Sequence, residues 1–199
     1  MGYIKKRISE LAKEHGGKKN ATDASEKWFN DGIKSRKINE AQSTRNRFEP
    51  GKIYVFEYVP KYAKELPWFD KNPVVLAIEQ IDKNDIGINL NLLPIAFKEK
   101  LLDDLYTKMQ GQIQGSLKEN SNPLHEKPLR ITYDGMKNYL EKFGYDFAIR
   151  QYIPSRKKGQ AVVSYSKWPE IALCRFMELS GMTSMKLRIL FNNYLKKNI

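Results

Sequence analysis

The spacing of hydrophobic residues predicts two helices near the start of the chain. Within Tyr3–Glu14 they recur every three or four positions, with lysines on the other faces, which is typical of a short amphipathic helix. The pair Gly16-Gly17 then predicts a helix end. We expect the polar segment Lys18–Thr22 to form a loop and Ala24–Ile33 to form the second helix. Lys34–Arg47 has almost no apolar periodicity, so we interpret it as an exposed arm or as a helix that packs on a partner and becomes ordered on binding.

The middle of the chain changes from helical spacing to alternation. Three segments rich in β-branched and aromatic residues predict antiparallel strands: Lys52–Val59, Pro73–Ile81 and Ile88–Leu92. The segment Asp82–Gly87 is expected to be a polar turn. One face of the first strand is fully aromatic, with Tyr54, Phe56 and Tyr58, and this favours a buried core over a base-stacking platform. Short connections between the strands predict a small SH3-like sheet or barrel.

The remaining sequence combines helices with further strands. Helical spacing predicts four helices: Ile95–Gln110, Gly135–Phe143, Glu170–Leu179 and Ser184–Lys197. Residues 111–128 contain two glycines and two prolines and are expected to form a long loop. The basic turn Pro154–Gly159 is expected to join Tyr145–Ile153, for which strand and helix both stay open, to a strand at Gln160–Tyr165 in a hairpin.

These elements predict the α+β class. We expect a small antiparallel SH3-like sheet or barrel, flanked by an N-terminal helical arm and a mixed, mainly helical C-terminal part. The predicted division is a basic helical arm at 1–49, a β-barrel-like core with its following helix at 50–110, and a basic mixed part at 111–199. A length of 199 residues suits one compact domain with an extension.

Charge narrows the classes of partner. The chain has 35 lysine and arginine residues against 23 acidic ones, a formal net charge of +12. The net charge is +5 over residues 1–49, −1 over 50–110 and +8 over 111–199, so a polyanion is expected to meet the two flanking parts. No apolar run is long enough to cross a bilayer, and no secretory signal is expected near the start. The single cysteine, Cys174, favours a reducing compartment.

Two groups of basic residues are the candidate DNA contacts. The first lies on the polar arm and consists of Lys34, Arg36, Lys37, Arg45 and Arg47. The second surrounds the predicted turn and consists of Arg150, Arg156, Lys157 and Lys158, with Tyr152 and Tyr165 near in sequence. Lysines and arginines on a turn can reach phosphates, and tyrosines can stack on unpaired bases. An ordinary solvated hairpin tip is the alternative interpretation of the second group.

Enzyme chemistry finds little support in the residues. Two histidines, His15 and His125, and one cysteine cannot form a His/Cys metal cluster of the usual spacing. Cys174 lies in an apolar helical stretch, which favours a small core residue over a nucleophile paired with His125. Neither a G-x-S-x-G elbow nor a phosphate-binding P-loop is present. We therefore expect no catalytic residues, no metal site and no cofactor.

Carboxylates near the second predicted strand leave one minor alternative open. Nucleases bind Mg²⁺ through two or three acidic side chains, and Asp70, Glu79 and Asp82-Lys83 are the nearest such group. Their spacing allows only some of them to project from one sheet face. A magnesium nuclease using Asp70 and Glu79 is therefore kept as an alternative hypothesis. Asp103-Asp104 diverge by 100° on a helix and are expected to form part of a polar face.

The middle segment carries a succession of motifs that resembles a protein family of tailed bacteriophages, particularly T4-like myoviruses. The matching stretches are Pro50–Lys61 (PGKIYVFEYVPK), Leu66–Pro73 (LPWFDKNP), Gly87–Pro94 (GINLNLLP) and Leu101–Tyr106 (LLDDLY), with Ser25–Phe29 (SEKWF) upstream. The resemblance covers roughly residues 25–106 and is loose beyond them. Trp68 and Phe69 stand where two tyrosines are common, and Asn91 where an aromatic residue or histidine is usual.

Members of this family are often labelled DNA end protector. The resemblance implies a non-enzymatic virion protein that holds the phosphates at a duplex end and denies exonucleases access. Its partners would be the double-stranded phage genome end and other virion proteins, with no membrane partner. The protein would be found in the virion, and in the host cytoplasm during assembly, as part of a larger assembly of unknown oligomeric state. The alternative is a structural adaptor of the neck, tail or baseplate that contacts neighbouring subunits through its arms.

Overall fold

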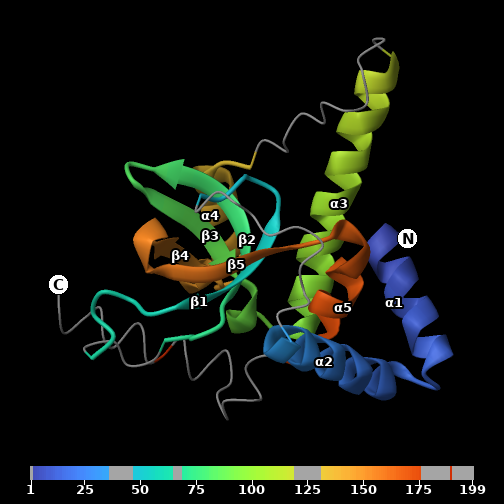
Figure 1. The fold of residues 1–199 in the computed structure, drawn as a ribbon. Coiled ribbons are helices and arrows are strands. Elements are labelled where there is room, and N and C mark those ends of the chain that lie inside the picture. Colours follow the sequence, from blue (N-terminus) through green and yellow to red (C-terminus); the bar gives the residue numbers. More distant parts are fainter. Residues whose placement is uncertain (1, 36–46, 65–68, 119–130, 176–188, 190–199) are drawn as a thin grey trace. The chain divides into compact units, whose positions relative to one another are not determined.

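The structure is a computed structural model that describes residues 2–35, 47–64, 69–118, 131–175 and 189, with side chains in those ranges except at 33–35 and 109–118 (Figure 1). The helices are α1 (Tyr3–Glu14), α2 (Lys18–Ser35), α3 (Ile95–Lys118), α4 (Tyr133–Glu141) and α5 (Trp168–Leu173). The strands are β1 (Ile53–Tyr58), β2 (Val74–Ile81), β3 (Asn84–Asn89), β4 (Ile149–Tyr152) and β5 (Lys157–Val163). The predicted α+β class is confirmed.

Contacts group the chain into two units, which we describe separately. The first unit comprises Met1–Lys37, Ile95–Arg130 and Ser164–Cys174. The second unit comprises Ile38–Pro94, Ile131–Val163 and Arg175–Ile199. The predicted division of the chain at residues 49/50 and 110/111 stays a prediction. Within the described residues, none of the helices combines the length and the apolar character needed to span a membrane.

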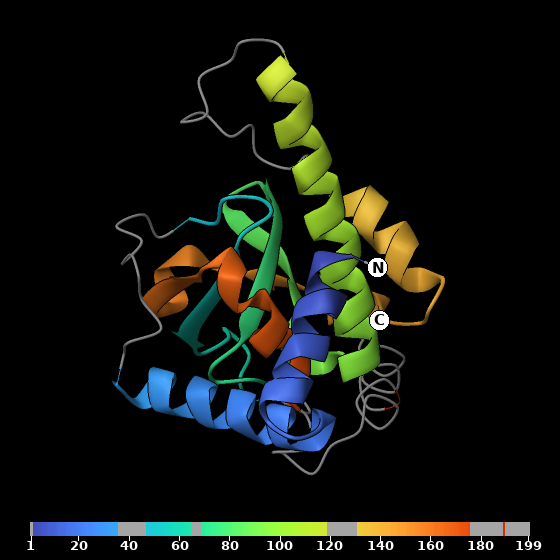
Figure 2. The ribbon, with the colours of Figure 1, turned by 90° about the vertical axis from the view of Figure 1, so that its right-hand side faces the viewer.

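The first unit is helical. Helices α1, α2, α3 and α5 contact one another, and Figure 2 shows α1 and α5 alongside α3. Ile4, Ile8 and Phe29 are buried, so α1 and α2 are packed helices, and the part of the predicted arm at 36–46 lies outside the described residues. The buried carboxylate of Asp103 accepts a hydrogen bond of 3.0 Å from the Ile4 N–H, which caps α1. Asp103 is therefore a structural residue and not part of a polar face.

The second unit is built on a five-stranded antiparallel sheet in the order β4-β3-β2-β1-β5. The sheet is open in the described residues, with β4 and β5 at its edges. It is also strongly curved, because Tyr58 on β1 meets Tyr152 on β4 although two strands lie between them. Their ring centroids are 5.1 Å apart, and the Tyr58 hydroxyl accepts a 3.2 Å hydrogen bond from the Ile153 N–H.

The concave face of this sheet holds an aromatic core. The predicted aromatic face of the first strand is buried there with residues from other segments: Phe48, Tyr54, Phe56, Tyr58, Val75, Ala77 and Tyr152. Phe48 stacks on Tyr54 at 4.7 Å between centroids, and Phe56 meets Tyr152 edge-on at 5.3 Å. Such offset and edge-on pairs stabilise a core beyond the area they bury. The prediction that the aromatic face of the first strand is buried in a core, and does not form a base-stacking platform, is confirmed.

The predicted hairpin between Tyr145–Ile153 and Gln160–Tyr165 is wrong. Strand β4 pairs with β3 and β5 pairs with β1, so the two strands lie at opposite edges of the sheet. A 3-10 turn at Pro154–Arg156 connects them. The curvature of the sheet brings the two edges close enough for this short connection, so a chain reversal is not required.

Three predicted boundaries also differ from the structure. The predicted loop over Lys18–Thr22 is wrong, since Gly16 and Gly17 adopt φ of +69° and +136° and complete the turn before α2 begins at Lys18. Helix α3 continues to Lys118, because helical hydrogen bonding tolerates a glycine at a cost of about 1 kcal/mol. The predicted loop at 111–128 is therefore wrong up to Lys118, and its remainder lies outside the described residues.

Two further element boundaries, the start of the third strand and the end of α5, also differ from the prediction. The turn before the third strand is shorter than predicted, because Asp82 adopts φ of +53° and β3 starts at Asn84. Helix α5 ends at Leu173 instead of Leu179, since Cys174 is extended. The predicted helix Ser184–Lys197 lies outside the described residues apart from position 189.

Candidate nucleic-acid interface

Most of the predicted arm contacts lie beyond what the structure describes. Arg36, Lys37 and Arg45 are outside the described residues, and so is the side chain of Lys34, whose backbone belongs to α2. Their role in DNA binding stays a prediction.

Arg47 is fixed to the sheet. Its Nε lies 3.0 Å from Asp85 Oδ1 on β3, and its Nη2 donates to Gln80 Oε1 on β2 at 2.8 Å. Gln80 in turn donates from Nε2 to the Phe48 carbonyl at 3.0 Å. These bonds tie the segment before β1 to β2 and β3. In this structure the Arg47 guanidinium therefore links the segment before β1 to the sheet.

Lys157 is buried instead of being presented on a turn. Its ammonium lies 2.6 Å from Asp85 Oδ2, and the side chains of both residues are fully buried. The same ammonium lies 3.9 Å from the centroid of the Phe48 ring, within the range of a cation–π contact. Burial lowers the pKa of Lys157, while the bond to Asp85 opposes this shift. Lys157 is therefore not free to reach a phosphate in this structure.

Arg150 is half-buried. It lies on β4 opposite Gly87 of β3, and burial lowers the pKa of its guanidinium. Of the two tyrosines considered for base stacking near this turn, Tyr152 is 3% exposed and Tyr165 is half-buried. Burial raises the pKa of Tyr152 well above its ordinary value. Tyr152 therefore offers no exposed contact here, and Arg150 offers only a partly exposed one.

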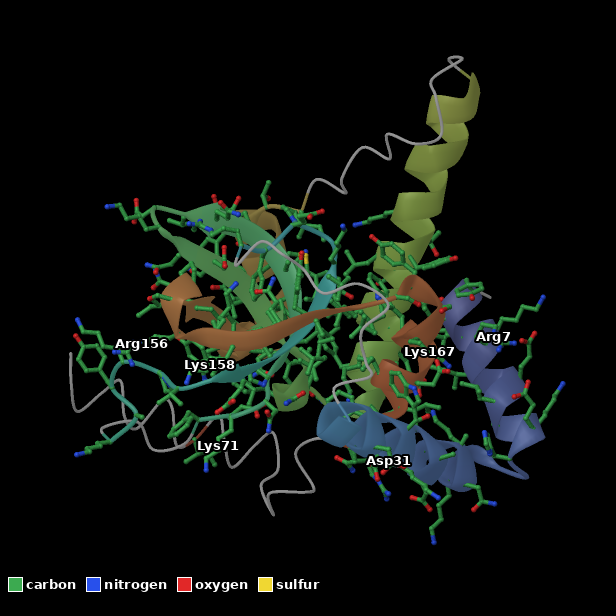
Figure 3. The ribbon with its side chains drawn as sticks, in the orientation of Figure 1. Arg7, Asp31, Lys71, Arg156, Lys158 and Lys167 are labelled. Carbon is green, nitrogen blue, oxygen red and sulfur yellow. The ribbon has the colours of Figure 1, made fainter. Side chains whose placement is uncertain are left out.

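Two of the predicted turn residues remain exposed, Arg156 and Lys158. The Arg156 Nη1 lies 3.4 Å from the carbonyl oxygens of both Val59 and Pro60, at the start of the β1–β2 loop. Lys158 lies opposite Glu57 in the β1–β5 register. Figure 3 shows Arg156 and Lys158 on the same side of the second unit as Lys71.

Sequence reasoning missed the cations of the β1–β2 loop. Lys61, Lys64 and Lys71 are exposed, and the Lys71 carbonyl accepts a 2.8 Å hydrogen bond from the Tyr58 N–H. This bond places Lys71 on one side of the end of β1, with β5 on the other. We define the loop surface as the exposed residues that these contacts gather: Val59, Lys61, Tyr62, Lys64, Lys71, Arg156 and Lys158. The surface is rich in cations, although Glu57 is exposed at its edge.

The carboxylates of the nuclease hypothesis have separate structural partners. Asp70 accepts hydrogen bonds from the Asn91 side chain and, at 3.0 Å, from the Asn72 N–H, and burial raises its pKa. Glu79 accepts a 2.9 Å hydrogen bond from the Tyr133 N–H at the start of α4. Among the described residues, no group of three or more His, Cys, Asp or Glu side chains is placed to hold a metal ion.

Cys174 also has a structural environment. Its thiol is buried, with Sγ 3.2 Å from the Glu170 carbonyl oxygen, and burial raises its pKa to about 12. The thiolate that a nucleophile requires is therefore disfavoured at neutral pH. The prediction of a buried core cysteine is confirmed.

Several residues of the motifs that carry the family resemblance have structural roles in the second unit. Gly51 adopts φ of +82° and donates its N–H to the Ala77 carbonyl, and Gly87 packs closely on Val75. The Asn89 side chain accepts from the Asn91 N–H and caps the 3-10 turn after β3. These motifs thus specify strand ends and turns of the second unit.

Comparison with protein families gives a match over most of the chain. A family model described as "Phage T4 terminal DNA protecting protein" matches residues 2–185, which spans both units. The chain belongs to this family. The suspected relation to the T4-like DNA end protectors is thereby confirmed. Curated proteins and solved structures contain no match to the chain.

Proposed function

We propose that this chain is a non-enzymatic virion protein that binds the ends of packaged linear double-stranded DNA and shields them from exonucleases. The family match over residues 2–185 is the observation that carries the proposal. The net charge of +12 suits a protein whose partner is a polyanion. The protein would act in the virion and enter it during assembly in the host cytoplasm, with other virion proteins as neighbours.

The loop surface supplies the exposed phosphate contacts of this proposal. These five exposed residues come from the β1–β2 loop, the 3-10 turn before β5 and β5 itself: Lys61, Lys64, Lys71, Arg156 and Lys158. The Arg156 contacts link the turn to the start of the loop. Each contact with a phosphate releases condensed counterions, so affinity depends steeply on salt. We include the arm residues Lys34, Arg36, Lys37 and Arg45 as further contacts. Arg47, Arg150 and Lys157 would act by positioning the sheet.

We further infer that the sheet has SH3-like character. The order β4-β3-β2-β1-β5, the curvature that lets Tyr58 meet Tyr152, and the 3-10 turn between β4 and β5 support this inference. Among the described residues between the first two strands of the sheet, Lys61, Lys64 and Lys71 are exposed.

End binding can be tested with two forms of one DNA sequence. The protein should bind a blunt linear duplex more tightly than a covalently closed circle, and it should slow digestion of the linear form by an exonuclease. Affinity should fall steeply as salt rises from about 50 to 200 mM. Equal affinity for the two forms would overturn the end-specific proposal. Salt-insensitive binding to a virion protein, without DNA binding, would instead favour the structural adaptor.

Paired variants can assign the contact surface. Arg156→Ala with Lys158→Ala should lower the slope of log affinity against log salt by about 2, because two phosphate contacts are lost. The matched control is Lys83→Ala with Lys142→Ala, two exposed lysines of the second unit outside the loop surface. An unchanged slope in the first pair would exclude Arg156 and Lys158 as contacts. Cleavage of plasmid with Mg²⁺, abolished by Asp70→Ala and Glu79→Ala, would revive the nuclease hypothesis.

A further inference from the structure

The loop surface contains an aromatic side chain that the fold leaves exposed. Tyr62 is 52% exposed, whereas Tyr54, Tyr58 and Tyr152 of the same unit are at most 7% exposed. The Lys61 Nζ lies 5.0 Å from the centroid of the Tyr62 ring. A cation beside an exposed ring keeps positive charge next to a flat apolar face. This combination is the chemistry that nucleic-acid-binding proteins use to contact a base and its phosphate together.

Tyr62 lies in the β1–β2 loop, and backbone groups at each end of this loop are held by contacts with other residues of the second unit. On the side of β1, the Arg156 guanidinium lies 3.4 Å from the Val59 and Pro60 carbonyl oxygens. On the side of β2, the Lys71 carbonyl accepts the Tyr58 N–H at 2.8 Å. A ring presented from an anchored loop loses less conformational freedom when a ligand covers it. The Arg156 contacts thus hold the backbone two and three residues before Tyr62.

Contacts with internal phosphodiesters cannot by themselves distinguish the end of a duplex from its interior, because these groups line the whole molecule. A terminal base pair differs in having one face uncovered by a neighbouring pair. An exposed aromatic ring among cations can cover that face while the lysines hold the flanking phosphates. The cations would then provide affinity, and the ring would provide preference for an end.

We propose that Tyr62 stacks on the terminal base pair of the duplex and gives the protein its preference for DNA ends. This inference rests on the proposed function and names the residue responsible for end specificity. Lys61, Lys71 and Arg156 would hold phosphates beside the terminus. The remaining basic residues would bind ends and interior alike.

The test compares one duplex sequence with open blunt ends and with both ends closed by hairpin loops. The wild-type protein should prefer the open form. Tyr62→Ala should weaken binding to the open form by roughly 5- to 150-fold, the range for loss of one base–aromatic stack. Its affinity for the closed form and its salt slope should stay unchanged. Tyr62→Trp and Tyr62→Phe should retain the preference, because both keep a flat ring.

A spectroscopic readout separates stacking from a loss of fold. A fluorescent 2-aminopurine at the terminal position should change its emission when wild-type protein binds, and Tyr62→Ala should abolish this change. The control Phe143→Ala removes another exposed aromatic ring, at the end of α4, and should behave as wild type. Because Tyr62 is half exposed, its alanine variant should melt at the wild-type temperature.

The outcomes distinguish the two proposals. If wild-type protein binds open and closed duplexes equally, the end-binding function and the role of Tyr62 both fail. If wild-type protein prefers open ends and folded Tyr62→Ala retains that preference, the role of Tyr62 is overturned while end binding stands.

Discussion

Asp85 and Lys157 form an ion pair with 2.6 Å between Oδ2 and Nζ, and both side chains are fully buried. The other carboxylate oxygen of Asp85 lies 3.0 Å from the Nε of Arg47. One carboxylate on β3 thus holds β5 and the segment before β1. Arg47 and Lys157, which the sequence analysis assigned to DNA binding, thus form ion pairs within the second unit in this structure.

Removing the shared carboxylate should destabilise the protein strongly. Asp85→Asn leaves the Lys157 ammonium buried without a counter-charge, which typically costs about 3–5 kcal/mol. Lys157→Met should cost less, because Arg47 still pairs with Asp85. Urea unfolding of both variants measures the difference. The exposed neighbour provides the control, since Lys158→Met should stay within about 0.5 kcal/mol of wild type.

The same variants address DNA binding. Lys157→Met should leave the salt slope of DNA binding unchanged, whereas Lys158→Met should lower it by about 1. A lowered slope in folded Lys157→Met would show that Lys157 leaves its buried site to contact phosphate.

Gly87→Ala should destabilise the sheet. An added methyl group would overlap the Val75 side chain and come within 2.8 Å of the Leu76 carbonyl oxygen, so two strands would have to separate. Overpacking of this kind costs about 1–3 kcal/mol. The urea midpoint should fall accordingly, while Gln151→Ala, at an exposed position of β4, should leave it nearly unchanged. An unaltered midpoint in Gly87→Ala would contradict the close packing.

Local spacing predicted the elements well where short-range interactions decide the outcome. The predicted first helix, Tyr3–Glu14, has the bounds of α1, because Ile4 and Ile8 define a buried stripe and Gly16 permits the turn that follows. The predicted first two strands likewise coincide with β1 and β2 to within a residue at each end.

Long-range pairing could not be predicted in the same way. The run Arg156-Lys157-Lys158 is uniformly basic, and only its pairing with β1, and the position of Asp85 on β3, decide that the middle lysine faces inward. Charge summed over residues 50–110 also hid the exposed lysines of the β1–β2 loop, because acidic residues elsewhere in that window cancel them. The candidate surface therefore emerges only when exposure is known.

Cys174 should resist modification in the folded protein. Its thiol is 0% exposed, and burial raises its pKa to about 12, so little thiolate exists at pH 8. An aromatic disulfide reagent should release almost no thiolate chromophore from native protein and one equivalent after denaturation, since the chain has a single cysteine. Rapid reaction of native protein, at a rate independent of added denaturant, would contradict this burial.

Lys98 should give the first unit an unusual dependence on pH. Its buried ammonium donates to the Cys174 carbonyl at the end of α5, and burial lowers its pKa to about 8, with Glu26 and Glu99 opposing the shift. The unfolded chain, with an ordinary pKa near 10.5, binds more protons between these values, so stability should rise with pH above about 8. The gain should be roughly 1 kcal/mol from pH 7.5 to 9.0.

Urea midpoints of wild type and Lys98→Met at the two pH values measure this contribution. Subtracting the stability of the variant from that of the wild type at each pH removes the contributions of other titrating groups. One of these groups is Cys174, whose raised pKa lowers the stability at higher pH. The wild type should gain stability relative to Lys98→Met as pH rises, because the cost of burying the ammonium is relieved. Parallel pH profiles would show that Lys98 keeps an ordinary pKa and that its ammonium is solvated.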